Sequence, residues 1–450
     1  ESDSNLLNSL RDKYKYILVD EFQDTSVINL EILKLLENNN LYVIGDVDQS
    51  VYSFINAEVG NIINFIDDFE NVEVISLPHN FRSTQKIIDV CNDLLKKYRD
   101  PDHPLNRFEK QISGREIDGD DVKVVVYNDE FIEARDIVED IKRRKEADPS
   151  LEYKDFCIMS RTNNGLLAFE NELSISEIPV TLSSGGSFYD RKEIDDLLSY
   201  AQLYVGEHDD AFRKVANRPN RYLANSMLRD LEEYAFNKNL SLEQAVEKGF
   251  DAGRYTTNLY RFLGTIEEIR EIKQKNAEKI LREIYYITNY KYFIQDKAMT
   301  NSEVIIKEDA INRLFESAKK FSSIQNFLNY VAVVKSNAKE EKDCVILSTA
   351  HSAKGLEWDV CYVVGVTDNN YPHAMLLSED KDEELRLLFM ALGRAKNHLQ
   401  ISLPVFEMGA TKTYEPSRFI EPLLNDSLNE AWSEVISGKE KSEFYYEHKE

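Results

Sequence analysis

Short apolar runs alternate with longer amphipathic stretches over the first third of the chain. The runs 17–19, 41–44 and 72–76 have the length and apolar content of buried strands. The stretches 27–36 and 84–98 place apolar residues at helical spacing. Alternation of this kind predicts a parallel sheet whose strands are joined by crossover helices.

A second alternating series follows residues 100–121, whose proline, glycine and charged residues are typical of a linker. Its predicted strands and helices are 122–127, 130–145, 156–160, 164–176, 179–182 and 191–204. From about 206 to about 335 the pattern is almost wholly helical. Strands then resume at 344–347, 360–364 and 399–401. The pattern therefore predicts an α/β fold with an all-helical block inserted in its second domain.

The composition supports a folded chain and limits its partners. Its 450 residues are 42% hydrophobic, which is enough for the cores of about three domains. A net charge of −26 argues against a basic shell that binds nucleic acid everywhere, although a local basic or aromatic channel remains compatible with it. Much of the acid lies in the runs 379–384 and from Glu434 onward, where a solvated face or a flexible end is expected.

The cysteines and the apolar runs bear on the compartment. Cys91, Cys157, Cys344 and Cys361 lie far apart in the sequence, without a C-x-x-C pair. Buried free thiols in a reducing compartment explain them better than disulfides or zinc. No apolar run approaches a membrane span and no secretory leader opens the chain. A cytoplasmic protein without a membrane partner is therefore expected.

Polar side chains follow the first two predicted strands. Asp20 and Glu21 come directly after the run 17–19, and Gln49 follows the run 41–44. The carboxyl edge of a parallel sheet is where nucleotides and their metal ions bind. One carboxylate there could hold Mg²⁺ and the other could orient an attacking water, whereas a solvated strand end is the plainer interpretation. The aromatic Phe54 could stack on a base or belong to the core.

A third strand leads into NFRST, where Phe81 and Arg82 precede a helix. The planar guanidinium of arginine suits a phosphate because it donates paired, charge-assisted hydrogen bonds. Each strand end is a weak signal alone. Three successive strand ends that carry carboxylates, a glutamine and an arginine predict a nucleotide site together.

These motifs resemble, in order, those of superfamily-one DNA helicases of the UvrD/PcrA/Rep type. DEFQDT, GDVDQSVYSF and NFRST are similar to the second, third and fourth motifs of that family. The later segments SRTN, GGSFYDRKEIDDLLSYAQL, STAHSAKGLEW and EELRLLFMALGRAKNHL resemble its further signatures. The resemblance covers the chain from about residue 14 to about residue 403.

The resemblance implies two RecA-like parallel-sheet motor domains, with ATP between them and single-stranded DNA across their tops. The expected segments are the remainder of the first motor domain, the second motor domain in two parts, a helical insertion between those parts, and an acidic carboxyl-terminal tail. Their expected bounds are, in chain order, 1–111, 112–205, 206–334, 335–405 and 406–450.

The resemblance also implies roles for the residues of the nucleotide site. Asp20 would coordinate Mg²⁺, and Glu21 would activate the attacking water. Gln49 and Arg82 would contact the γ-phosphate of ATP, and Phe81 would stack on the adenine.

Two residues from the second motor domain would complete that site by resemblance. Glu357 would lie near the nucleotide, and Arg394 would act as the arginine finger. Gly393 stands where the family usually has a threonine, from which a changed rate is expected. An arginine that reaches in from a facing domain would make hydrolysis depend on domain closure.

On the nucleic-acid side, the resemblance implies stacking and backbone contacts without base-edge recognition. Phe54 matches the base-stacking position of the family. Arg161, Asn163, Thr349 and His351 match positions near the strand. Stacking worth about 1–3 kcal/mol per base tolerates any sequence, which suits a translocating enzyme.

One family feature is missing from these residues. No G-x-x-x-x-G-K-[ST] phosphate loop occurs in the chain, so the resemblance implies that a missing amino-terminal segment or a separate chain carries this Walker A loop. The favoured hypothesis is the carboxyl-terminal portion of an ATP-dependent 3′–5′ helicase that acts on single-stranded and partly duplex DNA. A non-hydrolysing DNA- or partner-binding module and a helicase–nuclease subunit are the alternatives. Repair, replication, phage or plasmid functions and defence all remain open.

Overall fold

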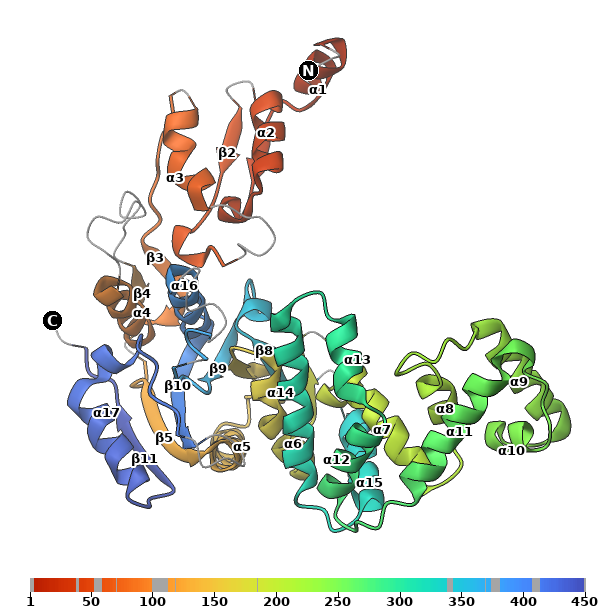
Figure 1. Cartoon of the computed structure of the whole chain (residues 1–450). Coiled ribbons are helices and arrows are strands. Elements are labelled where there is room, and N and C mark those ends of the chain that lie inside the picture. Colours follow the sequence, from red (N-terminus) through yellow and green to blue (C-terminus); the bar gives the residue numbers. More distant parts are fainter. Residues whose placement is uncertain are drawn as a thin grey trace. The chain divides into compact units, whose positions relative to one another are not determined.

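The structure is a computed structural model, and it separates into two compact units (Figure 1). The residues that it describes are 4–37, 40–51, 59–69, 71–98, 112–117, 119–183, 185–337, 343–368, 370–373, 381–406 and 413–448. The first unit comprises Glu1–Leu166 and Val345–Glu450, and the second comprises Leu167–Cys344. The helical block expected at 206–334 lies within the second unit, which also takes in residues 167–205.

The first unit begins with a small parallel sheet. Its elements are α1 (Ser4–Lys13), β1 (Ile17–Val19), α2 (Val27–Leu36), β2 (Leu41–Val43) and α3 (Val59–Asp68). β1 pairs with β2 in parallel, and α2 is the crossover between them. This arrangement confirms the α/β alternation that the hydrophobic pattern predicts. It also places the residues after β1 and those after β2 at one edge of the sheet.

The third strand lies later than the sequence predicts. Residues 72–78 have no regular structure, and β3 (His79–Thr84) pairs in parallel with β4 (Ser113–Arg115) before α4 (Gln85–Tyr98) begins. The prediction of a strand at 72–76 is therefore wrong. Ser83, near the end of β3, is the buried donor of a 2.6 Å hydrogen bond to the carbonyl of Ala395. Pairing with a distant strand, which local pattern does not encode, decided this position.

The first unit also contains most strands of a large sheet. Its strands within this unit lie in the order β11-β5-β10-β9-β6-β8, all parallel except the antiparallel pair β11 and β5. The bounds are β5 (Lys123–Asp129), β6 (Phe156–Ser160), β8 (Val345–Thr349), β9 (Trp358–Val363), β10 (Ala395–Phe406) and β11 (Lys441–Tyr445). The accompanying helices are α5 (Glu130–Ala147), α16 (Lys381–Leu392) and α17 (Glu421–Ile436). Every residue of β6 is buried, as in parallel sheets that are covered on both faces.

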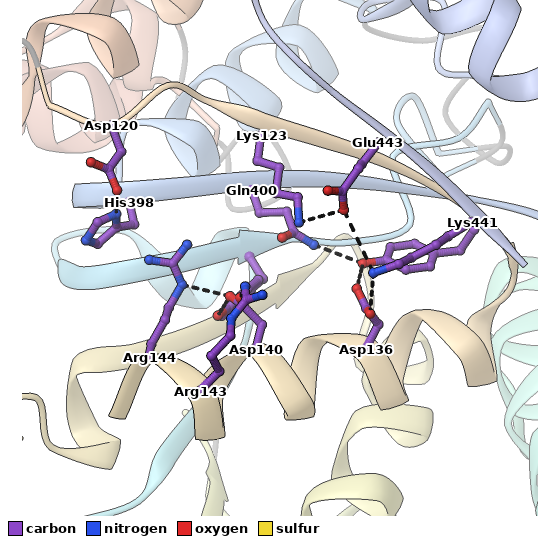
Figure 2. A network of polar contacts seen from close by, with 12 residues as sticks. Asp120, Lys123, Asp136, Asp140, Arg143, Arg144, His398, Gln400, Lys441 and Glu443 are labelled. Atoms are coloured by element: carbon purple, nitrogen blue, oxygen red, sulfur yellow. Dashed lines mark hydrogen bonds and ion pairs between the residues drawn. The ribbon is translucent and has the colours of Figure 1, made fainter. Parts of the chain in front are cut away.

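The described part of the predicted acidic tail is folded, so a flexible end from Glu434 onward is wrong there, whereas a solvated face agrees with the exposed side chains of Glu440, Glu443 and Glu447. Helix α17 buries Leu428 and Val435 in the core of the large sheet, and β11 adds a strand beside β5. Lys441 pairs with Asp136 of α5 at 2.5 Å, as Figure 2 shows.

The second unit is almost wholly helical and has one main core. Its elements are α6 (Leu167–Ile175), β7 (Val180–Leu182), α7 (Lys192–Val205), α8 (Asp209–Val215), α9 (Asn225–Lys238), α10 (Leu242–Glu247), α11 (Thr256–Arg270), α12 (Ala277–Ile287), α13 (Tyr290–Lys297), α14 (Asn301–Ala318) and α15 (Ile324–Asn337). The helical pattern predicted from about 206 to about 335 is thus confirmed. Phe188, which precedes α7, is buried in this core.

Two further expectations concern the cysteines and the membrane. Cys91, Cys157, Cys344 and Cys361 are all buried and free, as their isolated positions in the sequence predict. Burial raises the pKa of the Cys91 thiol to about 12, so this group stays protonated at neutral pH. Among the helices of the described ranges, none is long and apolar enough to cross a membrane.

Candidate nucleotide and nucleic-acid sites

The chain turns sharply where β1 delivers its carboxylates. Glu21 has φ 48° and ψ 46°, a left-handed conformation that costs a residue with a Cβ about 1–2 kcal/mol. The turn Phe22–Asp24 follows at once, and the ring of Phe22 is fully buried against the core of the small sheet. Asp20 and Glu21 therefore lie exposed at the carboxyl end of β1, held by an anchored turn.

A cavity of about 430 Å³ opens beside these carboxylates. Its lining combines the apolar side chains of Val19, Ile32 and Leu33 with polar ones, namely Asp20, Glu21, Asp24, Thr25 and Asn29. One oxygen of Asp24, Oδ1, is buried without a hydrogen-bond partner. Burial raises the pKa of Asp24, although its hydrogen bond with a lysine opposes that shift.

The donor set of this cavity fits Mg²⁺ that is shared with phosphates. Mg²⁺ in phosphate sites takes one or two carboxylates from the protein and completes its shell with phosphate oxygens and water. Over the described ranges, no group of three or more His, Cys, Asp and Glu could hold a metal by itself. Asp20 and its neighbours thus suit a metal that arrives with its nucleotide, and they do not form a closed protein cage.

Residues from four distant motifs meet near the ends of the first-domain strands. Arg82 donates through Nε to Glu357 Oε2 at 2.6 Å and through Nη1 to the carbonyl of Gly393 at 3.3 Å. Arg394 donates through Nη2 to Gln49 Oε1 at 3.2 Å. Four of the residues expected around the nucleotide are therefore joined by direct contacts, although they come from both ends of the chain.

The charges in this cluster are arranged to receive an anion. Arg394 is only 3% exposed, and burial, together with the nearby charge of Arg82, lowers its pKa to about 10. Glu357 has a lowered pKa because it accepts the hydrogen bond from Arg82 and also pairs with Lys396. The cluster holds three basic side chains, Arg82, Arg394 and Lys396, and the carboxylate of Glu357 pairs with two of them. A phosphate chain would neutralise this surplus of positive charge.

Phe81 occupies a position that suits stacking. Its side chain is 88% exposed, next to Arg82 on β3, so one ring face is open to a planar ligand. Exposure of a large aromatic side chain carries a solvation cost that a stacked base would remove. The other predicted aromatic residue, Phe54, lies outside the described residues.

Sequence reasoning missed a buried lysine in the same cluster. Lys354 donates through Nζ to Asp24 Oδ2 at 2.6 Å and to the carbonyl of Gln49 at 2.8 Å. Arg386 donates similarly to the carbonyl of Ser50 at 2.7 Å. Both basic residues stand inside quoted motifs, STAHSAKGLEW and EELRLLFMALGRAKNHL. Their place in those motifs was the available signal.

The residues expected along the nucleic-acid strand gather at another sheet edge. Ser160 and Thr349 are register partners at the ends of the parallel strands β6 and β8. Arg161 and Asn163 follow β6, and His351 follows β8, so the structure brings these predicted residues together. Asn163 is exposed at the start of a short helical turn, Asn163–Leu166.

Arg161 is already engaged within the chain. Its Nη2 and Nε donate to the carboxylate of Glu384 at 2.6 and 3.0 Å, and Glu384 is 1% exposed. Burial and the nearby charge of Arg161 lower the pKa of His351 to about 4, so this imidazole is neutral at pH 7. Thr349 bonds Ser352 through its hydroxyl. The edge therefore presents mostly neutral hydrogen-bonding groups, with its arginine paired.

Parallel sheets whose strand ends gather carboxylates, a glutamine and two arginines define a nucleotide-binding α/β protein with RecA-like motor domains. The chain belongs to the UvrD-like helicase family. The family model for the UvrD-like helicase C-terminal domain matches residues 75–405, and that for the UvrD/REP helicase N-terminal domain matches residues 1–70.

Individual relatives agree with the family models. ATP-dependent DNA helicase Rep of Escherichia coli (strain K12) is 30% identical over 96% of this chain and 67% of the relative. ATP-dependent DNA helicase PcrA of Staphylococcus epidermidis is 28% identical over 94% of this chain and 60% of the relative. ATP-dependent DNA helicase PcrA of Leuconostoc citreum is 29% identical over 98% of this chain and 61% of the relative. The chain thus spans about three fifths to two thirds of the length of these relatives.

Proposed function

We propose that this chain supplies much of the motor of an ATP-dependent DNA helicase that moves 3′ to 5′ along a single strand and opens partly duplex DNA. The observation that carries the proposal is the contact cluster of Gln49, Arg82, Glu357 and Arg394 beside the Asp20–Glu21 edge. The printed names of relatives such as Rep and PcrA, ATP-dependent DNA helicases, support the same activity.

The chemistry assigns separate tasks to the two carboxylates of the edge. Asp20 would hold Mg²⁺, which neutralises phosphate charge when it is bound. Glu21 would accept a proton from the attacking water, because its exposed carboxylate borders the same cavity. Phe81 would stack on the adenine with its exposed ring.

The remaining polar residues would stabilise the charge that develops on the γ-phosphate. Gln49 can donate a hydrogen bond through its amide, and Arg82 and Arg394 can each present a guanidinium fork. Glu357 would keep Arg82 oriented through their 2.6 Å ion pair. Arg394 would act as the finger, since it follows α16 and contacts Gln49 after β2.

A hydrolysing site of this type also needs a backbone cradle for the phosphates. We propose that a Walker A loop from another segment or chain supplies it. On the DNA side, Asn163, Thr349 and His351 would contact the strand backbone, Phe54 would stack on a base, and Arg161 would contribute its charge after it leaves Glu384. We propose a cytoplasmic protein whose substrate is single-stranded and partly duplex DNA.

The proposal is tested by ATP hydrolysis of the whole protein that carries this chain, with and without single-stranded DNA. Turnover stimulated by single strands is expected. Glu21→Gln should lower kcat by about 10²–10⁴-fold, and Arg394→Ala by about 10³–10⁵-fold. Arg418→Ala, which removes an exposed arginine paired with Asp368, is the matched control and should leave kcat unchanged. Binding of single strands without turnover would instead favour a non-hydrolysing DNA-binding module.

A further inference from the structure

Gln23 is buried between the two strand ends of the small sheet. Its side chain is 0% exposed. The amide Nε2 donates to Glu21 Oε2 at 2.5 Å, and the amide Oε1 accepts from the backbone N–H of Asp46 at 3.0 Å. The carbonyl of Gln23 also accepts from the hydroxyl of Ser50 at 3.4 Å. One buried residue therefore contacts the segments that follow both strands of the small sheet.

The amide can satisfy these contacts in only one orientation. A backbone N–H must meet the oxygen of the amide, so its nitrogen has to face Glu21. A carboxylate that receives a fixed donor loses rotational freedom, and its second oxygen is left for another proton or ligand. Gln23 thus selects one orientation of the Glu21 carboxylate.

Gly45 provides the space that this orientation needs. A Cβ at position 45 would lie 2.7 Å from Oε1 of Gln23 and 3.1 Å from Cδ1 of Ile62. The 2.7 Å contact is shorter than real Cβ atoms show, so a residue larger than glycine would push the amide of Gln23 away. The close approach of Gly45 to Gln23 is therefore part of the same arrangement.

The contacts continue beyond Gln23 toward the second motor domain. The carboxylate of Asp46 accepts from Gln49 Nε2 at 2.9 Å, and Gln49 Oε1 accepts from Arg394. A continuous line of hydrogen bonds runs from Glu21 through Gln23, Asp46 and Gln49 to Arg394. The carboxylate that would accept the proton and the arginine that would act as the finger are its two ends.

We propose that Gln23 is a positioning residue that ties the orientation of the Glu21 carboxylate to the strand end that holds Asp46 and Gln49. The inference rests on the proposed ATP hydrolysis and deepens it. When Arg394 engages Gln49, the strand end is held in place and Gln23 holds Glu21 in its productive orientation. Loss of the amide donor leaves ATP and DNA binding in place and slows the chemical step.

Two substitutions at position 23 separate positioning from packing. Gln23→Met keeps the volume and removes both hydrogen bonds, so kcat should fall about 10–100-fold, while the KM for ATP and the Kd for single-stranded DNA should change less than about twofold. Gln23→Glu places a like charge beside Glu21 at pH 8. Once this carboxyl is protonated, its O–H can donate to Glu21 again. The ratio of variant to wild-type kcat should therefore rise as the pH is lowered from 8 to 6 for Gln23→Glu, and it should stay constant for Gln23→Met.

Gly45→Ala and Gln400→Met complete the design. Gly45→Ala keeps Gln23 and displaces its amide, so it should reproduce the selective loss of kcat. Gln400→Met removes another buried amide, on β10, whose Nε2 donates to Tyr127 at 3.2 Å. It should leave kcat unchanged, because this amide lies outside the line of contacts.

The outcomes are distinct from those that test the function itself. A wild-type protein without DNA-stimulated turnover overturns the proposed function and the inference with it. Active wild type, with Gln23→Met or Gly45→Ala at wild-type kcat, overturns the inference alone. If Gln23→Met lowers the melting temperature too far to assay, the pH profile of Gln23→Glu decides: recovery at low pH supports positioning, and a flat profile overturns it.

Discussion

Lys354 and Asp24, 330 positions apart in the sequence, form a 2.6 Å ion pair. The lysine comes from the segment after β8, and the aspartate comes from the turn after β1. The Lys354 side chain is 6% exposed and also donates to the carbonyl of Gln49. The pair therefore joins the two strand ends of the small sheet to the large sheet through one buried cation.

Lys354→Met should lower the free energy of unfolding by about 1–3 kcal/mol, because Asp24 then keeps a partly buried carboxylate with no cation beside it. A double-mutant cycle with Asp24→Asn, followed by urea unfolding, should give a coupling energy of about 0.5–3 kcal/mol. Lys439→Met removes an exposed lysine paired with Glu434 and should cost under about 1 kcal/mol. Additive effects of the two substitutions at 354 and 24 would contradict a direct interaction.

Glu384→Gln should destabilise the first unit more than most single substitutions. The change leaves the guanidinium of Arg161, 11% exposed, without its carboxylate. Breaking a buried pair on one side costs about 3–5 kcal/mol, because the remaining charge stays desolvated. Chemical denaturation measures the loss, and Asp382→Asn on the exposed side of the same helix is the control. A loss below about 1 kcal/mol would mean that Arg161 reaches solvent readily.

Glu133 should make stability depend on pH. This α5 carboxyl is buried and accepts from Ser402 Oγ at 2.5 Å and from the N–H of Gly365 at 3.2 Å. Burial raises its pKa from 4.5 to about 8. Between those values the folded state binds a proton that the unfolded state releases. The free energy of unfolding therefore falls as pH rises from about 5 to about 8, by at most about 1.4 kcal/mol per pH unit.

Glu133→Gln should remove this dependence, because the amide oxygen still accepts both hydrogen bonds and carries no charge. Urea unfolding at pH 5, 6, 7 and 8 should show that the free energy of unfolding of the variant increases relative to that of the wild type as pH rises. Glu139→Gln, on the exposed face of α5, should follow the wild-type curve. Parallel curves for wild type and Glu133→Gln would show that Glu133 does not titrate differently on folding.

Leu428→Ala tests whether the carboxyl-terminal helix belongs to the core. The Leu428 side chain is fully buried in α17, and its truncation should cost about 2–5 kcal/mol through lost burial and a residual cavity. Asn429→Ala changes an exposed neighbour and should stay within about 0.5 kcal/mol of wild type. Thermal unfolding of the first unit reports both. Equal stability of the two variants would contradict the packing of α17 against the core of the large sheet.

Sequence patterns identified most elements because their signals are local. The runs that became β1, β2 and β6 are short, apolar and bounded by polar residues, and the helical block has helical periodicity throughout. The run 72–76 also has an apolar pattern, with Val72, Val74 and Ile75, yet it remains irregular because β3 starts at His79, where β4 is available to pair. Strand position depended on a partner far along the chain, which no local pattern contains.

The site divides in the same way. The ordered motifs predict that Asp20, Gln49, Arg82 and Arg394 belong to the nucleotide site, because the residue types at strand ends can be recognised in a sequence. The motifs also predict Arg161 as a site residue. They do not predict its ion pair with Glu384, because those two residues are 223 positions apart in the sequence. Lys354 and Gln23 both stand inside these motifs, but their contacts with Asp24 and Glu21 depend on the fold and are not visible in the sequence.

The sequence by itself determined the family, the α/β class, the helical insertion and the residue types at each strand end. Hydrophobic periodicity and motif order carry that information locally. Only the tertiary structure decided which of these side chains meet: Arg394 with Gln49, Lys354 with Asp24, and Gln23 with Glu21. Contacts of about 3 Å depend on how whole strands and helices pack, and packing is a property of the folded chain as a whole.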